Sequence, residues 1–184
     1  MNQQERQQVV EELAEFLPVP TNFKVSEISW VIPKNGDRDS IAAVGITSVD
    51  GVGEALREGC LVINVAEEIQ SDAHAHIVIQ PYTAEENYKT YGYEEEFYER
   101  QLTQVGLVAS LIDDSRYKGR SVVVHCHMGM ERSVLAVAWY LHTYCELTLS
   151  EAFEKIRVSR PIAQDRREWI GLNSGETFSE PFYG

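Results

Sequence analysis

The sequence predicts an α/β fold in which helices cover both faces of a central, largely parallel sheet. The first observation behind this prediction is the alternation along the chain of short apolar runs with longer segments whose apolar residues recur every three or four positions. The second is the length, because 184 residues can bury one sizeable core but not two. We therefore expect one domain over residues 1–184, with a helix at 3–17 and a tail at 173–184 on its periphery.

The first half of the chain is expected to supply a peripheral helix and most of the strands. The amphipathic pattern that runs up to Leu17 is stopped by Pro18 and Pro20. Asp50 is expected to cap a short helix that closes at Gly59. Apolar runs rich in β-branched residues predict strands at 28–32, 41–46 and 61–65, with a weaker candidate at 76–79.

The second half predicts a long loop followed by helices around one more strand. Residues 81–92 are polar, tyrosine-rich and without a clear period, which is typical of a functional loop. The pattern from about Glu94 to Asp114 predicts a long helix that Lys118-Gly119 ends. The remaining elements are a buried strand at 121–124, an apolar helix at 133–145 and a helix opened by a capping box at 148–151.

Charge and cysteine content exclude several classes of protein. The net charge of −13 argues against a partner that is a long nucleic acid or an anionic membrane surface, since both require a positive field. Three cysteines without paired metal spacing speak against a disulfide scaffold and fit a reducing compartment. With no apolar run long enough to cross a bilayer and no signal-like start, we expect a cytoplasmic location and no membrane partner.

The segment between the strand ending at Val124 and the helix starting near Arg132 has the properties of an anion site. So short a connection lets the backbone N–H groups curl toward one point at a helix N-terminus. Gly129 permits the turn, and Arg132 offers a planar fork that matches two phosphate oxygens. The expected substrate-binding residues are His127, Met128, Gly129, Met130, Glu131 and Arg132.

Cys126 stands at the entrance of this predicted site. The helix dipole, the loop amides and the guanidinium are the conditions that stabilise a thiolate. A thiolate facing a bound phosphate can attack phosphorus in line and form a phosphocysteine, which water then hydrolyses. Ser133 can donate a hydrogen bond to the departing thiolate in the second step. We expect no metal, since the contiguous residues His125, Cys126 and His127 cannot easily share one tetrahedral ion, and no cofactor.

The order His125-Cys126, five residues, then Arg132-Ser133 resembles the signature of the protein tyrosine phosphatase superfamily, and the small size with the run at 62–66 resembles its dual-specificity branch. The resemblance covers about residues 25 to 170. It implies that Cys126 is the nucleophile, Arg132 the phosphate clamp and Ser133 the helper for thiolate release. It further implies that His125 lowers the pKa of the cysteine from behind, and that Arg160 is a second anion-binding arginine.

The general acid departs from the family pattern. Relatives place an aspartate on a mobile loop about thirty residues before the cysteine, where it protonates the leaving oxygen. No aspartate lies between Ala73 and Ile112. Glu94 has the right spacing, and Glu85 and Glu86 follow the point where the family's loop begins. One of these glutamates is expected to act as the acid, unless the substrates have good leaving groups and need none.

These residues lead to three hypotheses about function. The first is metal-independent hydrolysis of phosphotyrosine, with phosphoserine, phosphothreonine or small aryl phosphates as further substrates; inositol lipids are disfavoured because the loop lacks lysine. The second is a pseudophosphatase that binds phosphorylated partners without turnover. The third is a rhodanese- or arsenate-reductase-like thiol enzyme, which also surrounds a cysteine with an anion loop.

Overall fold

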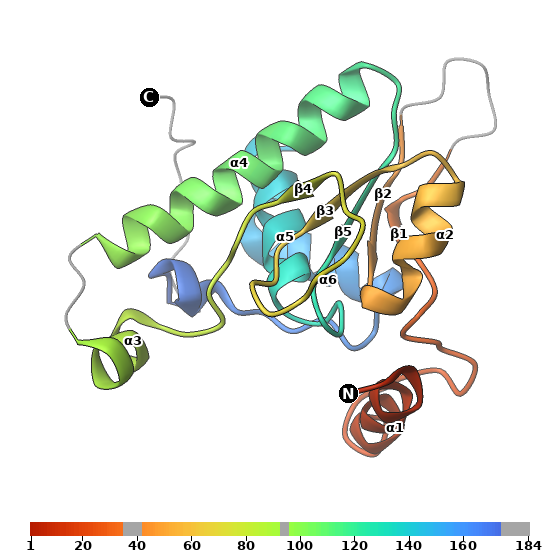
Figure 1. Ribbon diagram of the computed structural model, residues 1–184, viewed down its shortest axis with the longest axis horizontal. Helices are drawn as coiled ribbons and strands as arrows, with labels where there is room; N and C mark the ends of the chain where they lie inside the picture. The colour runs from red at the N-terminus through yellow and green to blue at the C-terminus, as the bar shows by residue number, and fades with distance from the viewer. Residues whose placement is uncertain (35–41, 93–95, 174–184) are drawn as a thin grey trace.

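A five-stranded sheet lies at the centre of the computed structural model, which describes residues 1–34, 42–92 and 96–173 (Figure 1). The strand order is β1-β2-β5-β3-β4. Only the β1–β2 pair is antiparallel; the other three pairs are parallel. The strands are β1 (Ser29–Ile32), β2 (Val44–Thr47), β3 (Leu61–Asn64), β4 (Ala75–His76) and β5 (Val122–His125). The predicted largely parallel α/β sheet is confirmed.

Helices pack on both faces of this sheet because neighbouring side chains of a strand point in opposite directions. Val122 and Val124 of β5 belong to the main core with α4, α5 and α6, whereas Val123 packs with Val62 and Ala55 under α2. The helices are α1 (Gln3–Leu13), α2 (Val52–Arg57), α3 (Ala84–Tyr91), α4 (Phe97–Tyr117), α5 (Arg132–Tyr144) and α6 (Leu149–Ser159), with 3₁₀ turns η1 (Val49–Gly51) and η2 (Arg167–Ile170).

The segment predicted as a long loop at 81–92 contains helix α3, so that prediction is wrong. Thr83 and Glu86 form a capping box at its start, and Gly92 ends it with φ 86°. Asn87 is the only residue of α3 that is buried. A helix of two turns with one buried polar residue has no apolar stripe, so it left no periodic signal in the sequence.

The start of the helix that follows β2 also differs from the prediction. Ser48, not Asp50, provides the cap: its side chain accepts a hydrogen bond from the Asp50 N–H. The carboxylate of Asp50 is free to pair with Arg6 of α1 instead. Helix α1 itself ends at Leu13, four residues before the predicted end at Leu17.

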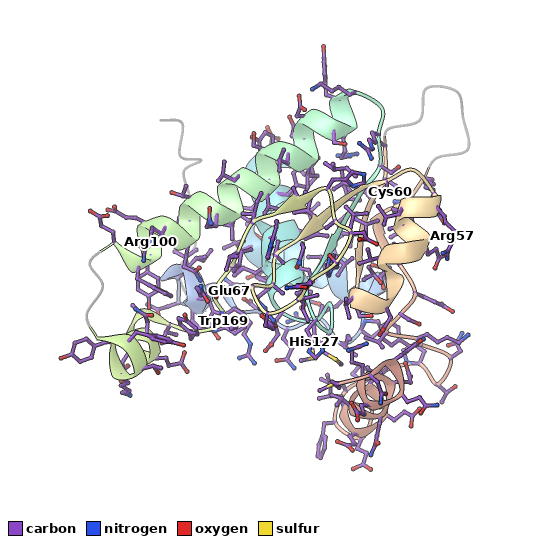
Figure 2. All side chains as sticks on the ribbon, viewed as in Figure 1. Arg57, Cys60, Glu67, Arg100, His127 and Trp169 are labelled. Carbon is purple, nitrogen blue, oxygen red and sulfur yellow. The ribbon has the colours of Figure 1, made fainter. Side chains whose placement is uncertain are left out.

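The parallel pairing brings the loops of the site together at one edge of the sheet. Thr47, His125 and Asn64 are aligned across β2, β5 and β3, so the residues that follow these strands emerge side by side. This is the edge at which parallel sheets bind ligands. His127 lies at this edge, while Cys60, which precedes β3, lies at the opposite one (Figure 2).

Candidate active site

The loop between β5 and α5 has its carbonyl groups turned outward. From residue 127 to residue 130, each carbonyl oxygen accepts a hydrogen bond from a donor outside the loop. The donors are Val49 N to His127 O at 3.2 Å, Arg160 Nη2 to Met128 O at 2.8 Å, Arg160 Nε to Gly129 O, and Gln164 N to Met130 O at 2.9 Å. With the carbonyls held on the outside, the N–H groups of the same peptides face the inside of the loop, where they can bind an oxyanion.

Gly129 makes this loop conformation possible. Its φ of +66° lies in the left-handed region, where a side chain is strained. A Cβ atom at this position would also lie 2.5 Å from the carbonyl oxygen of Thr47 and 2.6 Å from Arg160 Nη2. The loop therefore requires glycine here for both conformation and space.

Cys126 lies at the floor of the loop and is 3 % exposed. Its Sγ is 3.3 Å from the hydroxyl oxygen of Ser133. Burial alone would raise the pKa of the Cys126 thiol. The Ser133 hydroxyl and N–H, the charge of Arg132 and the Gly129 N–H outweigh this effect and lower the pKa below its ordinary value. The predicted proximity of cysteine, arginine and serine is thus present.

Arg132 begins α5 and turns its guanidinium toward Glu68, which follows β3. Nη1 donates to one carboxylate oxygen at 2.7 Å and Nη2 donates to the other. This hydrogen bond with Arg132 lowers the pKa of Glu68 to about 2. The fork that can grip two phosphate oxygens is therefore held in position by a carboxylate of similar shape.

His125 supports the cysteine from behind the loop. Its Nδ1 is 3.2 Å from the carbonyl oxygen of Cys126, and its Nε2 is 2.9 Å from the hydroxyl of Ser71. Burial lowers the pKa of His125 to about 4, so the ring is neutral at neutral pH. A neutral ring that bonds to a carbonyl must carry its proton on Nδ1, so His125 acts by hydrogen bonding rather than by charge.

The guanidinium of Arg160 lies behind the loop and not inside it. The residue is fully buried, and its nitrogens donate to the main-chain oxygens of Gly129, Met128 and Val25 and to the Ser29 hydroxyl. Burial lowers the pKa of Arg160 to about 10. Arg160, expected as a second anion-binding arginine, has a structural role in this arrangement, because its donors already hold loop carbonyls.

The glutamates expected as general acids are not gathered around the cysteine in the part of the chain that is described. Glu85 is exposed and pairs with Lys89 at 2.8 Å, and this bond lowers its pKa. Glu86 accepts a hydrogen bond from the Thr83 N–H in the capping box. Both lie on α3, which is set off to the side of the sheet (Figure 1). Glu94 lies outside the described residues.

The side chains of the loop face its surroundings. His127 contacts Arg6, Glu131 pairs with Arg166, and Met128 and Met130 pack against an apolar cluster next to α1. These residues thus contribute to the site chiefly through their main chain.

Sequence reasoning missed several partners of the site, among them Glu68, Ser71 and Arg6. Glu68 follows a strand that the structure places beside β5, and this pairing left no signal in the sequence.

Within 1–34, 42–92 and 96–173, no group of three or more histidine, cysteine or acidic side chains is placed to hold a metal ion. No helix in those same ranges combines the length and the apolar character that crossing a bilayer requires.

The fold and the site together define a largely parallel α/β domain in which an anion-binding loop surrounds a cysteine. Comparison with known proteins assigns this domain to a family. The family model of the dual specificity phosphatase catalytic domain matches residues 60–178. The chain therefore belongs to the dual specificity phosphatase catalytic domain family.

Two of its curated relatives match over short segments. Human Dual specificity protein phosphatase 12 is 33% identical over 63 residues, which is 34% of this chain and 18% of the relative. Dual specificity protein phosphatase 1 of Arabidopsis thaliana is 37% identical over 59 residues, 32% of this chain and 30% of the relative. The chain thus spans less than a third of the length of these relatives.

Solved structures support the fold. A single-residue variant of human DUSP28 has a TM-score of 0.58 and 17% identity, over 78% of this chain and 89% of that one. Tk-PTP in its active form has a TM-score of 0.56 and 18% identity, over 78% of this chain and 91% of that one.

Proposed function

We propose that the protein hydrolyses phosphate monoesters through a phosphocysteine on Cys126. The observation that carries the proposal is a buried thiol of lowered pKa at the centre of a loop whose N–H groups converge. In the first step the Cys126 thiolate attacks phosphorus, an S–P bond forms and the ester P–O bond breaks. The ester oxygen leaves with its electron pair and takes up a proton from an acidic side chain or from solvent. In the second step water attacks phosphorus, the S–P bond breaks, and inorganic phosphate leaves.

Arg132 and Ser133 supply the electrostatic part of this chemistry. The Arg132 fork grips two equatorial oxygens in the transition state, and the loop amides receive the charge that develops on them. Before substrate arrives, both Nη atoms donate to Glu68, so a phosphate must bind the remaining N–H groups of the guanidinium or displace this carboxylate. The Ser133 hydroxyl, 3.3 Å from Sγ, donates to the thiolate that is released in the second step.

The substrate class follows from the family and from the loop. Phosphotyrosine, with phosphoserine, phosphothreonine or small aryl phosphates as further substrates, is supported by membership of the dual specificity phosphatase family. A polyphosphorylated inositol is disfavoured, because the loop interior offers no lysine and the chain carries a net charge of −13. A reducing compartment such as the cytoplasm, which would preserve the thiolate, is part of the proposal.

Turnover of p-nitrophenyl phosphate tests the proposal directly. We expect steady, vanadate-sensitive turnover that Cys126→Ser abolishes and that Cys60→Ser leaves unchanged, since Cys60 lies at the opposite edge of the sheet. Trapping a phosphorylated peptide that contains residue 126 by rapid acid quench would identify the intermediate. Turnover that survives Cys126→Ser contradicts the proposal.

The second candidate is a binding module that holds phosphorylated partners without turnover. It is favoured by one observation: Glu85 and Glu86, expected as acids, are engaged in an ion pair and a capping box on α3. Release of one equivalent of nitrophenol followed by arrest would support this reading. If turnover continues, the variant Glu94→Gln tests the remaining glutamate. This substitution should slow the hydrolysis of substrates with poor leaving groups more than that of substrates with good ones.

A further inference from the structure

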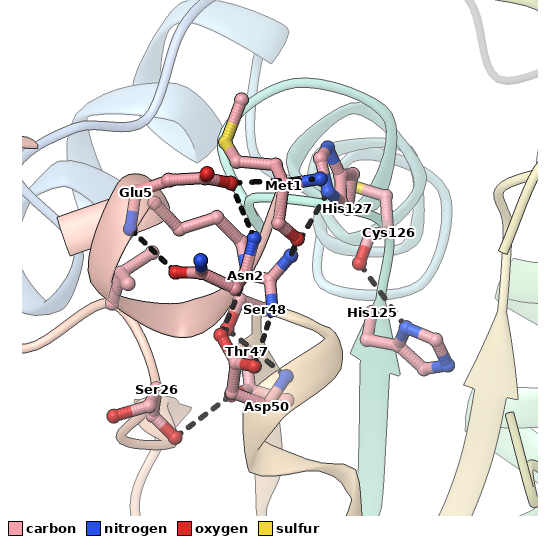
Figure 3. A network of polar contacts seen from close by, with 12 residues as sticks. Met1, Asn2, Glu5, Ser26, Thr47, Ser48, Asp50, His125, Cys126 and His127 are labelled. Carbon is pink, nitrogen blue, oxygen red and sulfur yellow. Dashed lines mark hydrogen bonds and ion pairs between the residues drawn. The ribbon is translucent and has the colours of Figure 1, made fainter. Parts of the chain in front are cut away.

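Helix α1 lies against the loop that holds Cys126, although it precedes the residues matched by the family model (Figures 1 and 3). Arg6 is its central contact. The residue is only 6 % exposed, and its Nε donates to Asp50 at 2.7 Å while Nη2 donates to the second carboxylate oxygen. Nη1 bonds to the Met1 carbonyl and lies 3.1 Å from Nε2 of His127. Arg6 therefore links the residues after β2 to the first residue after the cysteine.

His127 is held twice by the same turn. Its carbonyl accepts a hydrogen bond from the Val49 N–H at 3.2 Å, and its ring meets Arg6, which the neighbouring Asp50 fixes in place. The carbonyl contact fixes the orientation of the His127–Met128 peptide, and the ring contact fixes the position of the His127 side chain. Both constraints act on the residue that directly follows Cys126.

The contact with Arg6 also defines the proton on His127. A guanidinium has only N–H donors, so Nε2 must accept and the proton must lie on Nδ1. Burial and the charge of Arg6 lower the pKa of His127, which favours the neutral ring. The charge of Glu68 raises the pKa of His127, whereas the charge of Arg132 lowers it, as Arg6 does.

Apolar packing connects the same helix to the rest of the loop. Val10 of α1 forms a buried cluster with Val25 and Ile162, and the side chains of Met128 and Met130 pack against that cluster. The outer side of the loop from 127 to 130 is thus supported by one polar and one apolar contact region, and α1 contributes to both.

We propose that Arg6 of α1 is a positioning residue for the active site, which holds His127 in its neutral, Nδ1-protonated form and so keeps the loop preformed for an oxyanion. This inference rests on the proposed function for its catalytic consequence. Its structural content, the state of the His127 ring, can be measured without any turnover.

The variants must distinguish a loss of His127 positioning from a general loss of the folded structure. Arg6→Gln alone leaves the Asp50 carboxylate, whose side chain is 14% exposed, without its cation, which is costly. The double variant Arg6→Gln/Asp50→Asn removes both charges and is the principal test. Gln7→Ala is the matched control, because Gln7 anchors α1 to the Phe23 carbonyl and the Val25 N–H without contacting the loop. Thermal unfolding of each variant checks the fold.

Two measurements decide the proposal. Calorimetry with orthovanadate is expected to show binding weakened at least about tenfold in the double variant, the equivalent of one hydrogen bond to a charged group, and nearly unchanged in Gln7→Ala. Arg6→Lys should recover part of the loss, since it restores a cation and one donor. Long-range ¹H–¹⁵N spectra, with His127 assigned from the signal lost in His127→Gln, should show the Nδ1–H form in the wild type and a mixture of forms in the double variant.

The outcomes keep the two proposals apart. A wild type that neither binds vanadate nor turns over substrate contradicts the proposed function, and the spectra then still decide the role of Arg6. A wild type that binds vanadate beside a folded double variant with equal affinity overturns the positioning role. An unchanged Nδ1–H signal in that double variant overturns it as well.

Discussion

The ionisation of Cys126 depends on identifiable neighbours, and each neighbour can be removed separately. In Ser133→Ala the hydroxyl 3.3 Å from Sγ is lost, while the Arg132 charge and the loop amides remain. Because that hydrogen bond favours the thiolate, we expect the pH midpoint for alkylation of Cys126 by iodoacetamide to move upward. Mass spectrometry of the labelled peptides measures it.

Cys60 provides the internal control in the same experiment. It is 1 % exposed, and burial raises the pKa of its thiol, so its slow labelling should be the same in both proteins. A midpoint for Cys126 that stays in place in Ser133→Ala would mean that Ser133 does not stabilise the thiolate.

The stability that the Glu68–Arg132 ion pair contributes should depend on pH through the ionisation of Glu68. Its pKa in the folded protein, about 2, lies below the ordinary 4.5, so its contribution to stability is present above pH 4.5 and is lost as the pH falls through 2. Since the side chain is 54% exposed, solvent limits that contribution to about 0.5 to 1 kcal/mol. We expect Glu68→Gln to be less stable than the wild type by this amount at neutral pH.

Urea unfolding of both proteins at several pH values checks this prediction. The difference should shrink steadily as acid protonates Glu68 in the wild type. Glu15→Gln, at an exposed position after α1, is the control that should show little difference at any pH. A gap between wild type and Glu68→Gln that does not depend on pH would assign the effect to packing instead.

Residues that act within one short segment could be predicted from the sequence, whereas partners from distant segments could not. Cys126, Arg132 and Ser133 share one loop, so their spacing alone predicted their meeting, which the 3.3 Å contact of cysteine and serine reflects. Glu68 reaches the loop because β3 lies beside β5, and Arg6 reaches it because α1 pairs with Asp50 after β2. Pairing order is a long-range property that a single sequence without an alignment does not reveal.

At the scale of elements, the loop between β5 and α5 requires a glycine at position 129, whereas α4 does not require one at position 106. Gly129 has φ +66°, and a Cβ there would meet main-chain atoms of Thr47 at 2.5 Å, whereas a Cβ on Gly106 would meet nothing within 4 Å. We expect Gly129→Ala to lower the free energy of unfolding by about 2 kcal/mol or more and to abolish vanadate binding. Gly106→Ala, inside a helix, should raise that free energy by about 0.5 to 1 kcal/mol.

Chemical denaturation and vanadate calorimetry on the two variants test this contrast. Equal stabilities of Gly129→Ala and wild type would show that the loop can relax around a side chain. A destabilising Gly106→Ala would show that the α4 backbone is constrained in a way that its open surroundings do not indicate.

Elements with a strong periodic signal were predicted well, and short elements with mixed surroundings were not. The β-branched runs of β3 and β5 and the capping box of α6 were recognised because burial and capping leave direct marks on residue type. Helix α3 was missed because most of its residues are solvent-exposed. The 3₁₀ turn η1 was missed because Asp50 serves an ion pair with Arg6 rather than a cap.

At the scale of the whole molecule, the electrostatic field should oppose anionic substrates. The chain has a net charge of −13. The arginines Arg6, Arg132 and Arg166 around the loop each carry a carboxylate partner, in Asp50, Glu68 and Glu131 respectively. Because these local cations are neutralised in pairs, the field that a substrate meets at a distance is that of the acidic chain.

Salt should therefore change kcat/KM in opposite directions for substrates of opposite flanking charge. For a phosphotyrosine peptide with acidic neighbours we expect kcat/KM to rise severalfold between about 0.01 M and 0.1 M salt, as the Debye length falls from about 30 Å to about 10 Å and repulsion is screened. The same peptide with lysine neighbours should lose rate over that range, because screening weakens an attraction. p-Nitrophenyl phosphate, which has no flanking charges and carries only the charge of its own phosphate dianion, should lie between the two. If acidic flanks are preferred at low salt, a local cationic surface governs encounter in place of the net charge.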